Sequence, residues 1–189
     1  MTTQESEALP ELIVLDLDAC LWTPEMYELS SPPTAYDEAA GGVRAGTATV
    51  RLFPGAAAVL LRLLTDAHFS KVRVAAASST TEPGYAATCL TSLPIDASGS
   101  RTERVADLLD FKEIYPGSKG RAHFPALREA SGIAYDRMLF FDDCGYVDNA
   151  ADVARCCPGV ACVRTPDGLT EAHFDRALAA FAEGKRGIL

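Results

Sequence analysis

The chain has 189 residues, of which 48% are hydrophobic and 23% are charged, and its formal net charge at pH 7 is −9. These values are ordinary for a soluble globular protein and exclude a disordered, collagen-like or coiled-coil chain. The acidic balance disfavours nucleic acid and anionic membranes as bulk partners, although it permits a local positive pocket. The length predicts a single domain, residues 1–189, with a small insertion.

The first twelve residues, MTTQESEALPEL, lack the basic and apolar regions of a signal peptide, and no stretch reaches the roughly 18 apolar residues of a membrane span. We therefore expect a cytoplasmic protein whose six cysteines are reduced thiols. The segment CCPGVAC, residues 156–162, has neither a paired C-x-x-C nor a nearby histidine, so we do not expect it to bind zinc.

The first half of the chain begins with a strand pattern and then loses regularity. Residues 12–18, LIVLDLD, form an apolar run that ends in two carboxylates, which is typical of a buried parallel strand. Proline and glycine interrupt residues 21–50, so this insertion is predicted to be a flap rather than a large cap domain. Within and just after it, residues 43–52 predict a hairpin around Gly46, and Pro54 opens a helix.

The second half alternates between strand and helix patterns. Further strands are predicted at residues 71–78, 112–115, 137–143 and 159–165. Helices are predicted at residues 83–92, 119–131, 146–155 and 168–184, with a loop at 98–100 and a helical turn at 102–110. This alternation predicts an α/β fold of the Rossmann-like kind, a parallel sheet with helices on both faces.

Polar side chains cluster where three of these strands end. Asp16 and Asp18 follow the first strand, Ser78 ends the second, and Asp142 and Asp143 end another. Ligands of such folds bind at the carboxyl ends of the strands. Four neighbouring carboxylates are costly unless a cation neutralises them, and Mg²⁺ prefers oxygen ligands and a substrate phosphate. We therefore predict that the four aspartates form an Mg²⁺ site.

Two further residues fit a bound phosphate. The hydroxyl of Ser78 and nearby backbone N–H groups can hold a phosphate oxygen, although a serine in this position is as often a helix cap. Lys119 lies where a helix is predicted to start. A lone lysine is usually solvated, but beside four carboxylates it can neutralise both a phosphate and an attacking aspartate.

Four motifs together resemble one family. The segments DLDACLW, AAASST, EIYPGSK and FFDD are similar to those of the haloacid dehalogenase-like phosphohydrolases, in particular their magnesium-dependent phosphatase branch. The resemblance runs from about Leu12 to Val163, and EIYPGSK followed by HF is its most specific part. Two residues depart from the branch: Cys20 stands in place of threonine and Ser79 in place of arginine.

The resemblance implies a covalent mechanism. Asp16 would attack phosphorus and become an aspartyl phosphate, while Asp18 would protonate the leaving oxygen and then activate water. The backbone carbonyl of Asp18 would face the metal. This implies a magnesium-dependent phosphomonoester hydrolase that acts on a phosphorylated small molecule or a phosphoprotein, with phosphotyrosine and sugar or fructosamine phosphates as expected substrates.

The resemblance also assigns binding roles. Asp143 would bind Mg²⁺ directly, whereas Asp142 would either reach the metal through water or pair with Lys119. Ser78 and Lys119 would hold the transferring phosphoryl oxygens, with Ser79 beside them.

Other readings stay open at this point. A dehalogenase is disfavoured by Asp18 and the FFDD pair, and a phosphomutase by the small flap. A non-catalytic phosphate-binding or scaffold protein is supported only by Cys20 and Ser79. The lack of long heptads favours a monomer. Cys20 and Cys144, which each follow an acidic pair, are expected to be apolar filler, with oxidation-dependent inhibition as the alternative.

Overall fold

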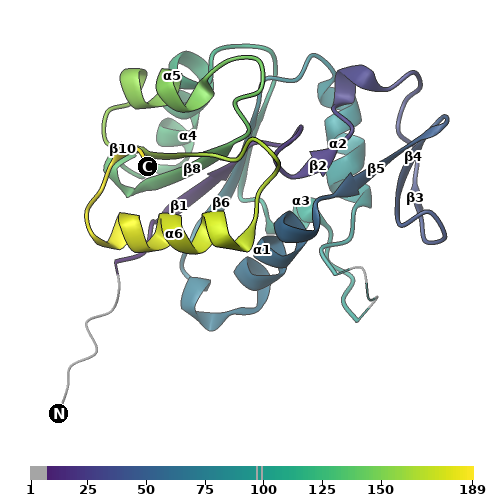
Figure 1. Ribbon diagram of the computed structural model, residues 1–189, viewed down its shortest axis with the longest axis horizontal. Coiled ribbons are helices and arrows are strands. Elements are labelled where there is room, and N and C mark those ends of the chain that lie inside the picture. Colours follow the sequence, from purple (N-terminus) through teal and green to yellow (C-terminus); the bar gives the residue numbers. More distant parts are fainter. Residues whose placement is uncertain (1–7, 97, 99) are drawn as a thin grey trace.

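The computed structural model describes residues 8–189 except 97 and 99, and its centre is a parallel sheet (Figure 1). Within these residues the sheet has six strands in the spatial order β10-β9-β8-β1-β6-β7, and every pairing is parallel. The strands are β1 (Leu12–Leu15), β6 (Arg73–Ser78), β7 (Phe111–Ile114), β8 (Met138–Asp142), β9 (Ala161–Arg164) and β10 (Gly187–Ile188). The predicted α/β class is confirmed.

Helices cover both faces of this sheet, as predicted (Figure 1). The longer ones are α1 (Pro54–Thr65), α2 (Pro83–Ser92), α4 (Phe124–Ser131), α5 (Asn149–Cys156) and α6 (Glu171–Ala182). Side chains alternate along β1: Ile13 and Leu15 pack with α1, α2 and α6, whereas Leu12 and Val14 pack with α4 and α5. Burial on both faces explains why β1 reads as an unbroken apolar run.

The predicted flap after β1 is a small antiparallel sheet in the order β2-β5-β4-β3. Its strands are β2 (Trp22–Thr23), β3 (Tyr36–Asp37), β4 (Gly42–Ala45) and β5 (Ala48–Leu52), and a 3₁₀ turn covers Met26–Glu28. Gly46 takes a left-handed φ of 62° in the β4–β5 hairpin, as its position in the sequence predicted. Buried Leu21, Trp22 and Val50 join the flap to the main core.

Several predicted boundaries were wrong. The helix expected from residue 146 begins only at Asn149, because Asp148 caps it by accepting a hydrogen bond from the Ala151 N–H. The helix expected at 119–131 is divided into a π-helical turn, Lys119–His123, and α4. The strand expected at 12–18 ends at Leu15, because the chain turns back after Asp16 into the flap. β10 was not predicted.

The shorter helical segments are Ala67–Phe69, α3 (Val105–Leu108) and Tyr135–Arg137. Among the described residues, no helix combines the length and apolar character needed to cross a membrane.

Candidate active site

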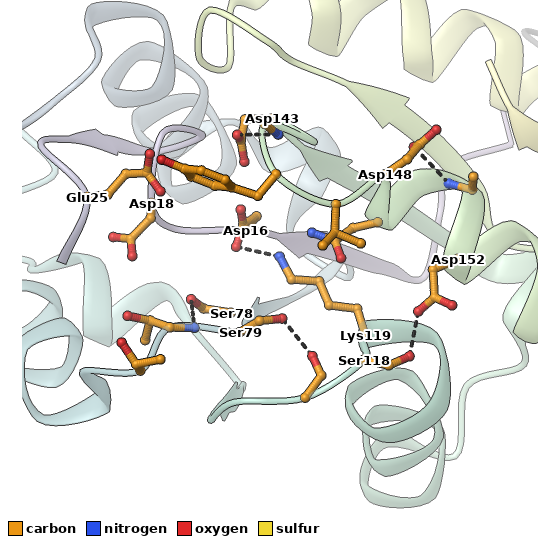
Figure 2. Close-up of a pocket in the computed structure, with 18 of the residues that line it drawn as sticks. Asp16, Asp18, Glu25, Ser78, Ser79, Ser118, Lys119, Asp143, Asp148 and Asp152 are labelled. Atoms are coloured by element: carbon orange, nitrogen blue, oxygen red, sulfur yellow. Dashed lines mark hydrogen bonds and ion pairs between the residues drawn. The ribbon is translucent and has the colours of Figure 1, made fainter. Parts of the chain in front are cut away.

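The site lies at the carboxyl edge of the central sheet, where three adjacent strands end (Figure 2). Asp16 directly follows β1, Ser78 is the last residue of β6, and Asp142 is the last residue of β8. Because β6, β1 and β8 are parallel neighbours, their final residues converge. The polar side chains that the sequence singled out are therefore brought together.

Lys119 is the centre of the charge network. Its Nζ lies 2.5 Å from Asp16 Oδ1 and 2.6 Å from Asp142 Oδ2, and its side chain is only 1% exposed. Burial alone would lower the pKa of Lys119, but the two carboxylates outweigh it and raise that pKa above its ordinary value. Lys119 is thus a fixed, charged cation beside the aspartates, where the sequence analysis expected it.

The carboxylates outnumber this cation. Asp16, Asp142 and Asp143 offer oxygens that all lie within 4.8 Å of one another. Burial raises the pKa of Asp16 well above its ordinary value; Lys119 opposes this rise, and the other two aspartates add to it. One lysine cannot neutralise three close carboxylates, so this all-oxygen set fits a hard divalent cation such as Mg²⁺.

The two aspartates of the FFDD motif differ in their partners. Asp142 accepts hydrogen bonds from the Cys144 N–H at 2.8 Å and from Asn149 Nδ2 at 3.1 and 3.2 Å, in addition to Lys119. Asp143 accepts one, from the Gly145 N–H at 2.8 Å. Asp142 is therefore occupied as an anchor for Lys119, and Asp143 has more capacity for a cation.

Asp18 lies apart from the three-aspartate group, so the predicted metal contact through its backbone carbonyl stays a prediction. Its Oδ1 accepts a hydrogen bond of 2.6 Å from the indole Nε1 of Trp22. Burial raises the pKa of Asp18, and this hydrogen bond lowers it by a smaller amount. A raised pKa helps a carboxyl group to hold a proton near neutral pH, which a general acid requires.

The two acidic pairs are followed by similar backbone turns. Ala19, after Asp18, has a φ of 56°, and Cys144, after Asp143, has a φ of 59°. Left-handed conformations are uncommon for residues other than glycine and concentrate at functional sites. The chain therefore turns sharply out of the sheet just after each pair.

The serine motif follows β6, which lies on the other side of β1 from β8, so it supplies hydroxyls on the side of Asp16 opposite to Asp142 and Asp143. Ser78 is buried, and its Oγ accepts a hydrogen bond of 3.3 Å from the Thr80 N–H. Ser79, where the branch has arginine, donates from Oγ to the Gly117 carbonyl at 2.9 Å. Ser79 thus fastens the loop that carries Lys119, a contact that the sequence did not predict.

His123 has a structural role beside the site. Its Nε2 donates to the carbonyls of Ser78 and Tyr115, at 3.0 and 2.9 Å, and its ring stacks on Tyr115 at 4.3 Å. Carbonyl oxygens only accept, so Nε2 carries the proton in this arrangement. His123 therefore ties the serine motif to the lysine motif.

A pocket of about 1060 Å³, far larger than a phosphate ion, is lined by Asp16, Asp18, Ser78, Ser79, Lys119 and Asp143. Tyr27 from the flap and Tyr146 from the β8–α5 loop also line it; their hydroxyls contact each other, and their rings meet edge-to-face at 5.9 Å. Arg121 and Arg155 are further lining residues. Apart from Tyr27, which lies in the predicted flap, no local sequence pattern marked these residues.

The cysteines beside the acidic pairs are poor nucleophiles. Cys20 is fully buried and accepts a hydrogen bond from Thr165 Oγ1 at 3.4 Å. Burial raises the pKa of Cys20 well above its ordinary value and raises that of Cys144 to about 12. Because the thiolate is the reactive form, these environments favour the filler role over the redox alternative.

Comparison with known proteins places this geometry in a family. The profile of the acid phosphatase family matches residues 8–184. Human magnesium-dependent phosphatase 1 is 34% identical over 185 residues, which cover 96% of this chain and 92% of the human protein.

Solved structures share the fold. A HAD family enzyme from Bacteroides thetaiotaomicron superposes with a TM-score of 0.59 at 16% identity, over 89% of this chain and 99% of that one. The N-terminal part of a Bacteroides fragilis protein, which contains a phosphatase domain complexed with Mg, gives 0.56 at 15% identity. That match covers 94% of this chain but only 39% of the other. The family profile spans nearly all of the described residues, and the human relative is matched along almost its full length, so the chain belongs to the acid phosphatase family.

Proposed function

We propose that this protein is a magnesium-dependent phosphatase that hydrolyses phosphate monoesters through an aspartyl phosphate on Asp16. The observation that carries the proposal is the buried triad in which Lys119 Nζ lies 2.5 Å from Asp16 and 2.6 Å from Asp142, with Asp143 beside it. The similarity to magnesium-dependent phosphatase 1 supports both the reaction and the metal.

In the first step an oxygen of Asp16 attacks phosphorus, and the bond between phosphorus and the leaving oxygen breaks. Asp18 donates its proton to that oxygen, so the alcohol or phenol departs neutral. In the second step Asp18 takes a proton from water, whose oxygen attacks phosphorus and releases inorganic phosphate and the Asp16 carboxylate. The raised pKa of Asp18 suits it to both roles.

Positioning and charge neutralisation complete the proposed mechanism. Lys119 neutralises Asp16 in the free protein and a phosphoryl oxygen in the transition state, and Ser78 and Ser79 line the same pocket. When bound by Asp16 and Asp143, Mg²⁺ supplies positive charge that screens the phosphate from the carboxylates. Asp142 keeps Lys119 in place.

The pocket supports a substrate with a sizeable leaving group. Its volume of about 1060 Å³ leaves space beyond the phosphoryl group, and the flap does not form a large cap over it. Phosphotyrosine, in a small molecule or a phosphoprotein, and sugar or fructosamine phosphates remain our proposed substrates. The cytoplasmic location and the monomeric state likewise remain predictions from sequence.

Hydrolysis of p-nitrophenyl phosphate with and without Mg²⁺ tests the proposal, with Asp16→Asn as the paired variant. We expect turnover that requires Mg²⁺ and falls by at least about 10³-fold in the variant, which corresponds to about 4 kcal/mol of transition-state stabilisation. Trapping of a phosphorylated Asp16 in rapidly quenched enzyme is the direct evidence for the intermediate. Turnover that persists in Asp16→Asn would rule out this nucleophile.

The scaffold alternative predicts a different result. A folded protein that binds Mg²⁺ and inorganic phosphate but hydrolyses neither aryl nor alkyl phosphates would support it. The substitutions Cys20→Thr and Ser79→Arg would then restore the residues that are usual in the branch. Hydrolysis should return if the departures at these positions abolished the activity, and should stay absent if the pocket merely rejects the test substrate.

A further inference from the structure

Helix α5 contacts the loop that carries Lys119 through one carboxylate, Asp152 (Figure 2). Asp152 Oδ2 accepts hydrogen bonds from Ser118 Oγ at 2.6 Å and from the Gly120 N–H at 3.0 Å. These two donors come from the residues directly before and after Lys119. A single carboxylate oxygen therefore holds both sides of the lysine in the chain.

The anchoring extends beyond these two bonds. Ser118 Oγ also accepts from the Arg121 N–H at 3.1 Å, so the serine that Asp152 holds is the cap of the π-helical turn. The other oxygen, Oδ1, accepts from Arg155 Nη2 at 2.6 Å. Although burial acts to raise it, the pKa of Asp152 is lowered by the hydrogen bonds from Ser118 and Gly120 and by Arg155. Asp152 is thus a charged carboxylate that accepts hydrogen bonds from Ser118, Gly120 and Arg155.

Close packing makes this contact stiff. A Cβ atom on Gly120 would lie 2.7 Å from the Asp152 carbonyl oxygen and 2.9 Å from Cys156 Cβ. The Cys157 thiol, from the residue after α5, donates to the Gly120 carbonyl at 3.2 Å. The loop and the helix therefore touch along their backbones, and Lys119 projects from a segment with little freedom to shift.

The same helix also holds the lysine's partner. Asn149, at the start of α5 and three residues before Asp152, donates from Nδ2 to both oxygens of Asp142. Residues three apart lie on one face of a helix. One helical turn therefore fixes both members of the Lys119–Asp142 pair.

We propose that Asp152 is a positioning residue that acts through Lys119, holding the ammonium group where it can serve the nucleophile and the phosphoryl oxygens. The proposal rests on the phosphatase function proposed above. Asp152 itself is not assigned any contact with the phosphate. The competing explanation is that a negative charge in the first turn merely stabilises α5.

A double-mutant cycle separates these two explanations. Asp152→Ala should lower kcat/KM by about 10²-fold, mostly through kcat, since a displacement of about 1 Å can have this effect. In a Lys119→Met background the same substitution should change kcat/KM by no more than about twofold, because the group through which it acts is gone. Losses that add in full would overturn the proposal.

Two matched variants complete the cycle. Asp152→Asn retains an oxygen that can accept from Ser118 and Gly120, so it should recover most of the activity lost in Asp152→Ala. An asparagine variant as slow as the alanine variant would contradict anchoring by these bonds. Asp175→Asn removes an equivalent charge from α6, where Asp175 pairs with Arg62 at 2.5 Å, and should leave kcat/KM unchanged.

A crystal structure of Asp152→Ala tests the proposal independently of turnover. We expect Lys119 Nζ to move out of contact with Asp16 or Asp142. Retention of both contacts at 2.5 and 2.6 Å would overturn the positioning role even in an active enzyme. If the wild-type protein hydrolyses no phosphate monoester while these contacts are lost in Asp152→Ala, the phosphatase proposal is contradicted but the positioning of Lys119 by Asp152 is still supported.

Discussion

The two sides of the pocket differ in how their side chains are held. At the sheet edge, Lys119 and Asp142 are buried and each has several partners inside the protein. At the flap side, Tyr27 is 51% exposed and Tyr146 is 79% exposed, and their hydroxyls mainly contact each other. Groups that must not move are fixed by packing, whereas groups that are exposed can adapt to a ligand.

This difference indicates which side carries the reaction and which side contacts the rest of the substrate. Substitutions at the sheet edge should reduce kcat and alter stability together, because each removes a partner from a buried charge. Substitutions among the exposed tyrosines should change KM and substrate preference with little effect on kcat.

The largest effect is expected for Lys119→Met. Loss of the ammonium group that lies between Asp16 and Asp142 should reduce kcat/KM by about 10³-fold or more and destabilise the metal-free protein by about 3–5 kcal/mol. Burial already raises the pKa of Asp16, and this pKa should rise further without Lys119, so the stability deficit should shrink as the pH falls. Urea unfolding at pH 5 and pH 7 measures the difference in unfolding free energy between the wild-type protein and Lys119→Met. A difference that is larger at pH 5 than at pH 7 would contradict this account.

Asp18→Asn should have the next largest effect. Loss of the general acid should lower kcat/KM, which reports the steps up to release of the leaving group, by about 10²-fold or more for an alkyl phosphate and by less for p-nitrophenyl phosphate, whose leaving group needs little protonation. In the wild-type enzyme, kcat/KM for the alkyl phosphate should fall as the pH rises through the raised pKa of Asp18, because the acid must carry a proton. An equal loss of kcat/KM for both substrates would argue against Asp18 as the acid.

Binding of Mg²⁺ should produce a moderate stabilisation. At a concentration 100 times the dissociation constant, binding contributes about 2.7 kcal/mol, which raises Tm by roughly 5–10 °C in a chain of this size. Asp143→Asn should remove most of this increase in Tm. Asp143 accepts a hydrogen bond from Gly145 alone among the described residues, so its carboxylate has the most capacity to bind the cation. A full Tm shift in that variant, measured by differential scanning calorimetry, would place the cation elsewhere.

The smallest effect is expected for Tyr146→Ala. Its side chain is 79% exposed, so stability should change by less than about 0.5 kcal/mol. The KM for aryl phosphates should change a few-fold, while kcat stays within about twofold. A fall in kcat comparable to that of Lys119→Met would remove the distinction between the two sides of the pocket.

Sequence patterns predicted the buried parts of the molecule well. Strands such as β6 and β8 were visible because burial on both faces leaves a continuous apolar run that ends in a polar residue. The hairpin predicted around Gly46 followed from a backbone conformation that glycine favours, and the helix predicted to end at residue 131 is followed by Gly132 with a left-handed φ of 71°. The convergence of Asp16, Ser78 and Asp142 followed from the rule for parallel sheets.

Long-range side-chain contacts could not be predicted in this way. Asp152 reads as an ordinary acid in the first turn of a helix, and only the packing of α5 against residues 118–120 reveals what it holds. No local sequence pattern indicates the roles of Asn149 and Tyr146 either. They lie at and just before the start of α5, which the Asp148 cap determines and which apolar periodicity did not locate. The close approach of Gly120 to Asp152 and Cys156 is likewise a tertiary contact that no local sequence pattern marks.

The hydrogen bond between Trp22 and Asp18 gives the protein a built-in optical probe. Trp22 is the single tryptophan of the chain, and its indole N–H donates directly to the proposed general acid. When tryptophan is excited selectively over the six tyrosines, the emission therefore originates entirely from Trp22, whose indole contacts Asp18 at the junction of the flap and the central sheet. Titrating that emission with Mg²⁺, vanadate or acid reports events at Asp18 without any label, in the same cuvette that measures turnover.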